Sequence, residues 1–197
     1  MIQAIDKRRS IRKYLNNEIS EQDISEIIKS GIQAPSSKNR QPWKFVVVQG
    51  NAKSEMLQAF NRGINREENG VALIPESTKY IESAKHTIEI LEQSPVVIFV
   101  VNPLGKGILK EITPEERIYD VCNIQSISAA IQNMLLEATE MGIGSLWVCD
   151  IFFAYQELSE WLNTSGELLA AVALGYPDES PNPRPRKQID EVVEWRY

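Results

Sequence analysis

Residues 95–101 read Pro-Val-Val-Ile-Phe-Val-Val, and this run decides the fold class. It is apolar at both odd and even positions and rich in β-branched residues, which predicts a central strand covered on both faces. Shorter apolar runs at 45–48, 145–149 and 168–174 predict further buried strands. Helical patterns separate these runs, so we expect a mixed α and β class with a central sheet of about four or five strands.

The helices on either side of residues 95–101 have the clearest spacing. One is expected at about 80–92, and the longest at about 117–141, where large and small apolar residues form a wide stripe. Another begins after Ser20, where the pattern is similar to a capping box, and ends before Pro35. Shorter helices are expected at 53–60 and at about 155–162.

Two segments lack the pattern of a helix or a strand. Residues 61–79 are polar, with the turn signal Asn69-Gly70 and the breaker Pro75, and form either a lid over a pocket or a plain surface excursion. Residues 178–197 form a proline-rich arm whose composition alone is typical of disorder. The arm ends in an apolar stretch at 189–195, which is able to dock as an edge strand, including on a partner.

Composition narrows the class of protein. The 197 residues carry a formal net charge of −6 and are 43% hydrophobic, as in an ordinary globular protein, so one domain over 1–197 is expected. The negative charge argues against a nucleic-acid partner, because duplex binders usually carry a basic surplus. The first residues lack the apolar core of a signal peptide, and no apolar run approaches the roughly 20 residues of a membrane span. We therefore expect a cytoplasmic protein with no membrane partner.

Several kinds of catalysis find no support in the sequence. His86 is the only histidine, and no Gly-x-Ser-x-Gly elbow accompanies it, so a Ser-His-Asp triad is unsupported. Cys122 and Cys149 are expected to be buried thiols and cannot form a four-ligand zinc site alone. There is no phosphate-binding loop of a nucleoside triphosphatase and no dinucleotide fingerprint after a strand. The neighbouring acidic residues are interpreted as solvated surface: Glu67, Glu68, Glu115, Glu116, Glu191 and Glu194.

Cations and small hydroxyls are nevertheless kept at three separated places. Residues 8–14 read Arg-Arg-Ser-Ile-Arg-Lys-Tyr, residues 34–43 read Ala-Pro-Ser-Ser-Lys-Asn-Arg-Gln-Pro-Trp, and the arm adds Arg184 and Arg186. Guanidinium groups and serine hydroxyls are the donors that hold a phosphate. A chain without conventional catalytic side chains that keeps such donors is typical of proteins in which a cofactor carries the chemistry.

Segments 8–14 and 35–43 resemble those of the FMN-dependent nitroreductase family, and the resemblance covers nearly the whole chain, least clearly at about 61–82. It implies an α+β sandwich with a central mixed sheet flanked by helices, in an intertwined homodimer. The two chains would associate through the long central helix. The arm at 178–197 would reach the partner subunit and add a strand to its sheet.

The resemblance also implies where FMN binds. Arg8 and Ser10 would hold the phosphate and ribityl chain, Arg9 would contribute backbone contacts, and Arg12 would face the N1/O2 end of the ring. The late pair Arg184 and Arg186 would join the phosphate site. The loop that reaches the flavin from the second subunit corresponds to Pro35, Ser36, Ser37 and Asn39. A strand end that includes Trp147 and Cys149 would lie near flavin N5 and O4 through its backbone.

The implied activity is that of an oxidoreductase. NADH or NADPH would give hydride to flavin N5, and an electron-poor nitroaromatic or quinone would then take it at the same face, by a ping-pong mechanism. No catalytic side chain and no metal is implied. Two alternatives stay open: a specialised flavin enzyme of the dehalogenase, peptide oxidase or flavin-cleaving type, and a flavin-binding dimer without turnover.

One position departs from the family pattern. Many members place an asparagine and a lysine of a middle helix at the pyrimidine end of the flavin. The nearest candidates here are Lys85, His86 and Glu89, and none makes a clean match. The flavin potential, the preferred nicotinamide and the natural acceptor are therefore left undecided by the sequence.

Overall fold

The computed structural model describes residues 2–197 and is built on a single antiparallel sheet. The sheet has four strands in the order β1-β2-β4-β3. They are β1 (Lys44–Gln49), β2 (Val96–Asn102), β3 (Gly144–Val148) and β4 (Glu167–Gly175). The α+β class is confirmed, and the expectation of a mixed sheet is wrong. Burial on both faces requires only that helices cover both faces, and these helices cover an antiparallel sheet equally well.

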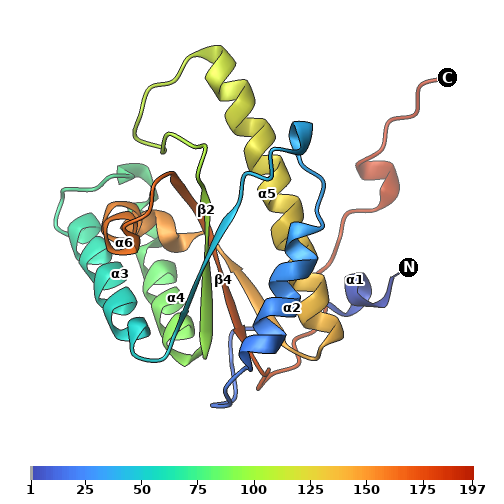
Figure 1. Ribbon diagram of the computed structural model, residues 1–197, viewed down its shortest axis with the longest axis horizontal. Helices are drawn as coiled ribbons and strands as arrows, with labels where there is room; N and C mark the ends of the chain where they lie inside the picture. Colours follow the sequence, from blue (N-terminus) through green and yellow to red (C-terminus); the bar gives the residue numbers. More distant parts are fainter. Residues whose placement is uncertain (1) are drawn as a thin grey trace.

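Helices form a layer on each face of the sheet, as Figure 1 shows with the sheet seen nearly edge-on. One layer contains α2 (Glu21–Ile32) and the long α5 (Pro114–Glu140). The other contains α3 (Ala52–Glu68), α4 (Ile81–Gln93) and α6 (Tyr155–Leu162). Alternate residues of β2 point into the two layers, so all of its residues are buried and the apolar run has no polar face.

The shorter elements connect and extend these layers. The N-terminal α1 (Gln3–Lys7) is followed by an extended segment, and one-turn helices occur at η1 (Ser37–Asn39), η2 (Pro75–Tyr80), η3 (Asp150–Ala154) and η4 (Ile189–Glu191). Ser20 caps α2 as expected, since its hydroxyl accepts a hydrogen bond from the Asp23 N–H at 3.0 Å. None of the helices within residues 2–197 combines the length and the apolar character that crossing a membrane would need.

Residues 61–68 are not part of a polar surface segment. They continue α3, and Gly63, Ile64 and Glu67 are buried against the core. Glu67 is only 2% exposed, pairs with Arg66 at 2.5 Å and accepts a hydrogen bond from the Leu73 N–H at 2.8 Å. The interpretation of Glu67 as solvated surface is therefore wrong, because an arginine on the same helix and the following turn compensate its charge.

The arm at the C-terminus is exposed from residue 182 onward. It forms no strand with its own chain in the described residues and extends away from the sheet beside α5 (Figure 1). Its large apolar side chains face solvent: Ile189, Val192, Val193, Trp195 and Tyr197. Exposed apolar side chains close together in one segment are typical of interaction surfaces.

Candidate functional site

The arginine-rich segment 8–14 runs along the outer edge of the sheet. Ser10 forms a parallel bridge with Ser145 of β3, and the Ile11 N–H donates to the Ser145 carbonyl at 3.0 Å. Gly144 permits this approach, because a Cβ there would lie 2.9–3.0 Å from the Ile11 side chain. The apolar Ile11 is buried, so the polar residues on either side of it are held at a fixed edge of the fold.

The start of the arm holds the other side of the same segment. The Asp178 N–H donates to the Lys13 carbonyl at 2.9 Å. In return, Oε1 of Glu179 accepts hydrogen bonds from the backbone N–H groups of Arg12 at 2.5 Å and of Lys13 at 3.3 Å. Buried Tyr14 locks the turn by donating from its hydroxyl to the Ile11 carbonyl at 2.7 Å. The two basic regions, far apart in the sequence, are thereby tied together in space.

This arrangement brings Arg186 close to Arg8. The pKa of the Arg8 guanidinium is lowered from its ordinary value, first by burial and then by the positive charges of Arg186 and Arg9. Within residues 2–197 no carboxylate forms an ion pair with any of the five arginines predicted for the site, which are Arg8, Arg9, Arg12, Arg184 and Arg186. Glu179 accepts from backbone N–H groups of the segment and forms no ion pair with these guanidinium groups, so the neighbouring positive charges of Arg8 and Arg186 favour binding of an anion.

The arginines differ in what their side chains do. Arg9 turns back on the chain and donates to the carbonyls of Asp6 at 2.6 Å and Arg8 at 2.9 Å. Arg12 is exposed and reaches the Ser10 carbonyl at 3.3 Å. The Arg9 side chain therefore shapes the turn, whereas Arg8 is half-buried and has no ion-pair partner within residues 2–197.

A hollow of about 180 Å³ adjoins this segment, and its wall includes Arg9, Ser145 and Thr139. Ser145 is 2% exposed, and its hydroxyl has no hydrogen-bond partner in the described chain. A buried hydroxyl without a partner, at a hollow that Arg9 also lines, is able to donate a hydrogen bond to a bound anion. Sequence reasoning missed Ser145, because it lies in a run that predicts only a buried strand.

The outer edge of β3 supplies backbone groups. Ser145 directs its carbonyl outward to Ile11, and residues two apart on a strand share an edge, so the backbone N–H and C=O of Trp147 face outward as well. Cys149 comes directly after the end of β3 and is exposed, so the expectation that its thiol is buried is wrong. Burial of part of its side chain and the charge of Asp150 raise the pKa of the Cys149 thiol. Thus Trp147 and Cys149 lie on the same edge as the arginine segment.

The predicted loop 35–39 has a strained backbone. Lys38 and Asn39 both have φ near +53°, and Gln41 has φ +50°. Such conformations cost free energy and are concentrated at functional sites. The Ser36 hydroxyl accepts from the Gln41 N–H at 3.0 Å, and the Ser37 N–H donates to Ser126 of α5 at 3.2 Å. The loop is therefore a fixed structure, with Pro35 and Asn39 exposed on it.

The loop lies beside the middle of α5, whereas the arginine segment lies near the C-terminal end of this helix. The loop is fixed at Ser126, whereas Thr139 borders the hollow beside Arg9. These two positions are 139 − 126 = 13 residues apart on one helix, which is about 20 Å at 1.5 Å per residue. Figure 1 shows the same separation, with η1 beside one half of α5 and α1 beside the other. One chain does not bring all of the predicted site residues together.

The middle helix that should face the pyrimidine end of the flavin is α4, and its only lysine, Lys85, is engaged in an ion pair. In α4, Nδ1 of His86 lies 3.0 Å from the Glu89 carboxylate, and Lys85 pairs with Glu68 at 2.6 Å. Both members of the His86–Glu89 pair are mostly exposed. Lys85 and His86 are thus each paired with a carboxylate on the surface of the fold.

Comparison with known proteins identifies the family. The model of the nitroreductase family matches residues 5–176. The chain belongs to the nitroreductase family. Its similarity to a Haemophilus influenzae protein named "Putative NAD(P)H nitroreductase" is 27% identity over 216 residues, covering 99% of this chain and 96% of the relative.

Solved structures agree with this assignment. A nitroreductase-family structure from Desulfovibrio desulfuricans in complex with FMN has a TM-score of 0.70 and 25% identity, covering 100% of this chain and 96% of that one. An FMN- and NADPH-dependent nitroreductase from Sphigopyxis sp. strain HMH has a TM-score of 0.77 at 18% identity, covering 99% and 98%. The latter likeness concerns the fold alone.

The residues of this chain fit the chemical needs of FMN. Its phosphate, with about −1.5 to −2 charges at pH 7, requires cationic and hydroxyl donors. The unpaired guanidinium of Arg8, Arg186 beside it and the unpartnered hydroxyl of Ser145 are donors of this kind. The outward backbone groups at Trp147 suit a planar ring with polar atoms along one edge.

Proposed function

We propose that the protein is an FMN-dependent oxidoreductase that passes hydride from NADH or NADPH to an electron-poor acceptor of the nitroaromatic or quinone type. The observation that carries the proposal is the proximity of Arg8 and Arg186, neither of which has an ion-pair partner within residues 2–197, at the sheet edge where Ser10 bridges Ser145. Bound FMN supplies the hydride chemistry, which the side chains lack. Donor and acceptor would use one face of the flavin in turn, so initial-rate plots should give parallel lines.

Each part of the chain has a separate task in this proposal. Arg8, Arg186 and Ser145 hold the phosphate, and Arg12 faces the pyrimidine end of the ring. The Glu179 carboxylate keeps the arm against the arginine segment through two backbone hydrogen bonds, so that Arg186 stays near Arg8. The backbone at Trp147 and Cys149 orients the ring at the sheet edge.

We also infer that a homodimer completes the site. Pro35, Ser36, Ser37 and Asn39 lie too far along α5 to reach a flavin held by the arginine segment of their own chain. The surface of α5 offers an apolar contact, since Ile118 is 63% and Val121 43% exposed. A second copy related by a twofold axis would bring its loop to the first copy's arginines, and each exposed arm would find a surface.

The function is tested by the visible spectrum of the purified, FMN-supplemented protein before and after anaerobic addition of NADH or NADPH. The proposal predicts flavin bands that bleach with at least one donor and return when a quinone or nitroaromatic compound is added. Bands that persist with both donors would instead favour the flavin-binding dimer without turnover. A protein that stays colourless with added FMN would contradict the flavin site itself.

The specialised flavin enzymes remain a second candidate, distinguished by the region 61–80. Residues 61–68 are core-packed helix, so a lid would be limited to the turn and η2 at 69–80, whose start is fastened to the Glu67 carboxylate. Removing residues 70–78 and joining the ends with a short glycine linker should leave turnover of small quinones intact. A selective loss of activity on bulky acceptors would favour the specialised class.

A further inference from the structure

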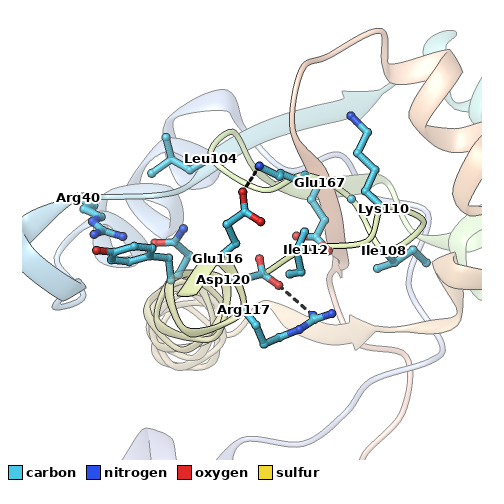
Figure 2. A pocket seen from close by; sticks show the side chains of 13 residues that line it. Arg40, Leu104, Ile108, Lys110, Ile112, Glu116, Arg117, Asp120 and Glu167 are labelled. Atoms are coloured by element: carbon cyan, nitrogen blue, oxygen red, sulfur yellow. Dashed lines mark hydrogen bonds and ion pairs between the residues drawn. The ribbon is translucent and has the colours of Figure 1, made fainter. Parts of the chain in front are cut away.

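A second cavity, of about 280 Å³, lies between the loop after β2 and the first turns of α5. Figure 2 shows its lining side chains. Its apolar lining side chains are those of Leu104, Ile108 and Ile112 and the ring of Tyr119. Ligand pockets usually measure about 300–1,000 Å³, so this volume suits a molecule of amino-acid size and is too small for a dinucleotide.

Two buried polar side chains that line the cavity each have one oxygen without a hydrogen-bond donor. Asn123 of α5 and Glu167 of β4 are each 4% exposed. Oδ1 of Asn123 and Oε2 of Glu167 accept no hydrogen bond in the described chain. Buried acceptors without donors are costly, so the cavity is suited to a ligand that carries N–H or O–H groups.

Most charges around the cavity cancel in pairs, which Figure 2 marks with dashed lines. Lys106 forms an ion pair with Glu116 and lowers the pKa of that carboxyl to about 2. Nη1 of Arg117 lies 3.5 Å from Oδ2 of Asp120. The remaining acid at the cavity is Glu167.

Glu167 is poised to exchange its proton near neutral pH. Burial, followed by the negative charge of Asp120 and a hydrogen bond with it, raises the pKa of Glu167 to about 7. Arg117 and Asn102 oppose this shift in part. A cationic ligand group would take the place of this proton.

Two cations without a carboxylate partner lie among the more exposed lining residues. The guanidinium of Arg40 lies 4.4 Å from the centre of the Tyr119 ring, and Lys110 is exposed on the loop. Neither forms an ion pair within residues 2–197. The cavity therefore combines a buried carboxyl, apolar side chains and two basic residues.

We propose that this cavity binds a small amphoteric molecule of the amino-acid type, with its ammonium group on Glu167 and Asn123 and its carboxylate directed to a basic lining residue, Arg40 or Lys110. The apolar body of the ligand lies along the wall formed by the loop and Tyr119. The cavity adjoins the loop of residues 35–39, since Arg40 lines it, but ligand binding there does not require hydride transfer.

Three matched probes test the proposal by titration calorimetry on the full chain supplied with FMN at pH 8. L-phenylalanine carries both charges, 3-phenylpropanoate lacks the ammonium, and 2-phenylethylamine lacks the carboxylate. We expect L-phenylalanine to bind and each analogue to bind at least about tenfold more weakly, as for a lost charge-assisted hydrogen bond. Absence of binding by L-phenylalanine, or equal affinity of either analogue, would overturn the proposal.

The pH dependence identifies the group that receives the ammonium. If the ligand binds the ionised form of Glu167, affinity for L-phenylalanine should rise about tenfold between pH 6 and pH 8. Glu167→Gln should weaken binding and remove this rise, and Glu115→Gln, at the exposed start of α5, should change neither. Ile112→Trp, which fills the cavity without altering its charges, should abolish binding; unchanged affinity in both Glu167→Gln and Ile112→Trp would overturn the assignment.

The flavin spectrum is recorded in the same samples. Binding of FMN without binding of L-phenylalanine would overturn this inference and leave the proposed oxidoreductase intact. Binding of L-phenylalanine by a protein that holds no flavin would support the cavity site and contradict the flavin site.

Discussion

Removing the Ser145 hydroxyl should have opposite effects on the stability of the flavin-free protein and on its affinity for FMN. Its buried hydroxyl has no partner in the chain, so Ser145→Ala removes a desolvated polar group and should leave the flavin-free protein equally stable or more stable. The same change removes a donor from the proposed phosphate site and should weaken FMN affinity about tenfold. Thermal unfolding and FMN titration measure the two effects.

Ser159→Ala is the matched control for that experiment, since the Ser159 hydroxyl is also buried without a partner but lies on α6, in the opposite helix layer. It should leave FMN affinity unchanged. Equal losses of affinity in both variants would show that Ser145 acts only through the fold.

Glu67 and its neighbour Glu68 differ sharply in their surroundings. Glu67 is 2% exposed and compensates Arg66 and the Leu73 N–H, so Glu67→Ala should lower the free energy of unfolding by about 3 kcal/mol. Glu68→Ala removes only an exposed pair with Lys85 and should lower the free energy of unfolding far less than Glu67→Ala. Urea unfolding of both variants gives the comparison, and similar costs would contradict the buried pair.

Glu167 makes stability depend on pH. Its folded-state pKa of about 7 lies above its ordinary value of 4.5, so the folded protein binds the proton more tightly and stability falls as pH rises from about 4.5 to 7. Glu167→Gln removes this loss. The variant should gain about 2 kcal/mol relative to the wild type between pH 5 and pH 7.5, in unfolding curves across that range. A constant difference between the two proteins would contradict the raised pKa.

At the scale of elements, the strongest patterns in the sequence predicted the structure best. The run at 95–101 is β2, and the long stripe at 117–141 is α5 within a few residues. The direction of strand pairing was not predictable, because burial on both faces is the same for parallel and antiparallel strands. The length of α3 was missed because Glu67 is buried by pairing with Arg66, and no hydrophobic pattern records such compensation.

The candidate site was also predictable only in part. The cationic segments could be chosen from residue type, since they are isolated in an acidic chain. The approach of Arg186 to Arg8 and the hydroxyl of Ser145 depend on contacts between residues more than a hundred positions apart. One sequence without its fold contains no signal for them.

Gly144 of β3 determines how closely the arginine segment packs against the edge of the sheet. Its missing side chain lets Ile11 pack against β3, since a Cβ at this position would lie only 2.9–3.0 Å from the Ile11 side chain. Gly144→Ala should force the segment outward, cost about 1–2 kcal/mol in stability and weaken FMN binding. Ile11→Val in the same chain should restore part of both losses. No recovery in the double variant, by unfolding and FMN titration, would contradict this account.

At the scale of the whole molecule, the central claim is that the arginine segment of one copy and the loop of another form each flavin site. The reason is distance within one chain. Ser126, which fixes the loop, and Thr139, which borders the hollow beside Arg9, are about 20 Å apart along α5. The exposed apolar residues of α5 and of the arm offer the contacts that a dimer would bury. A chain that lacks the arginines and a chain that lacks the loop side chains should therefore complement each other in a mixed dimer.

The most direct test mixes two such variants, Arg8→Ala with Arg186→Ala in one chain, and Ser36→Ala with Asn39→Ala in the other. Each variant alone should bind little FMN. After joint refolding, random pairing makes about half of the dimers mixed, each with one intact site, so about a quarter of the wild-type flavin absorbance should return. A mixture that binds no more FMN than its separate components would contradict the shared site.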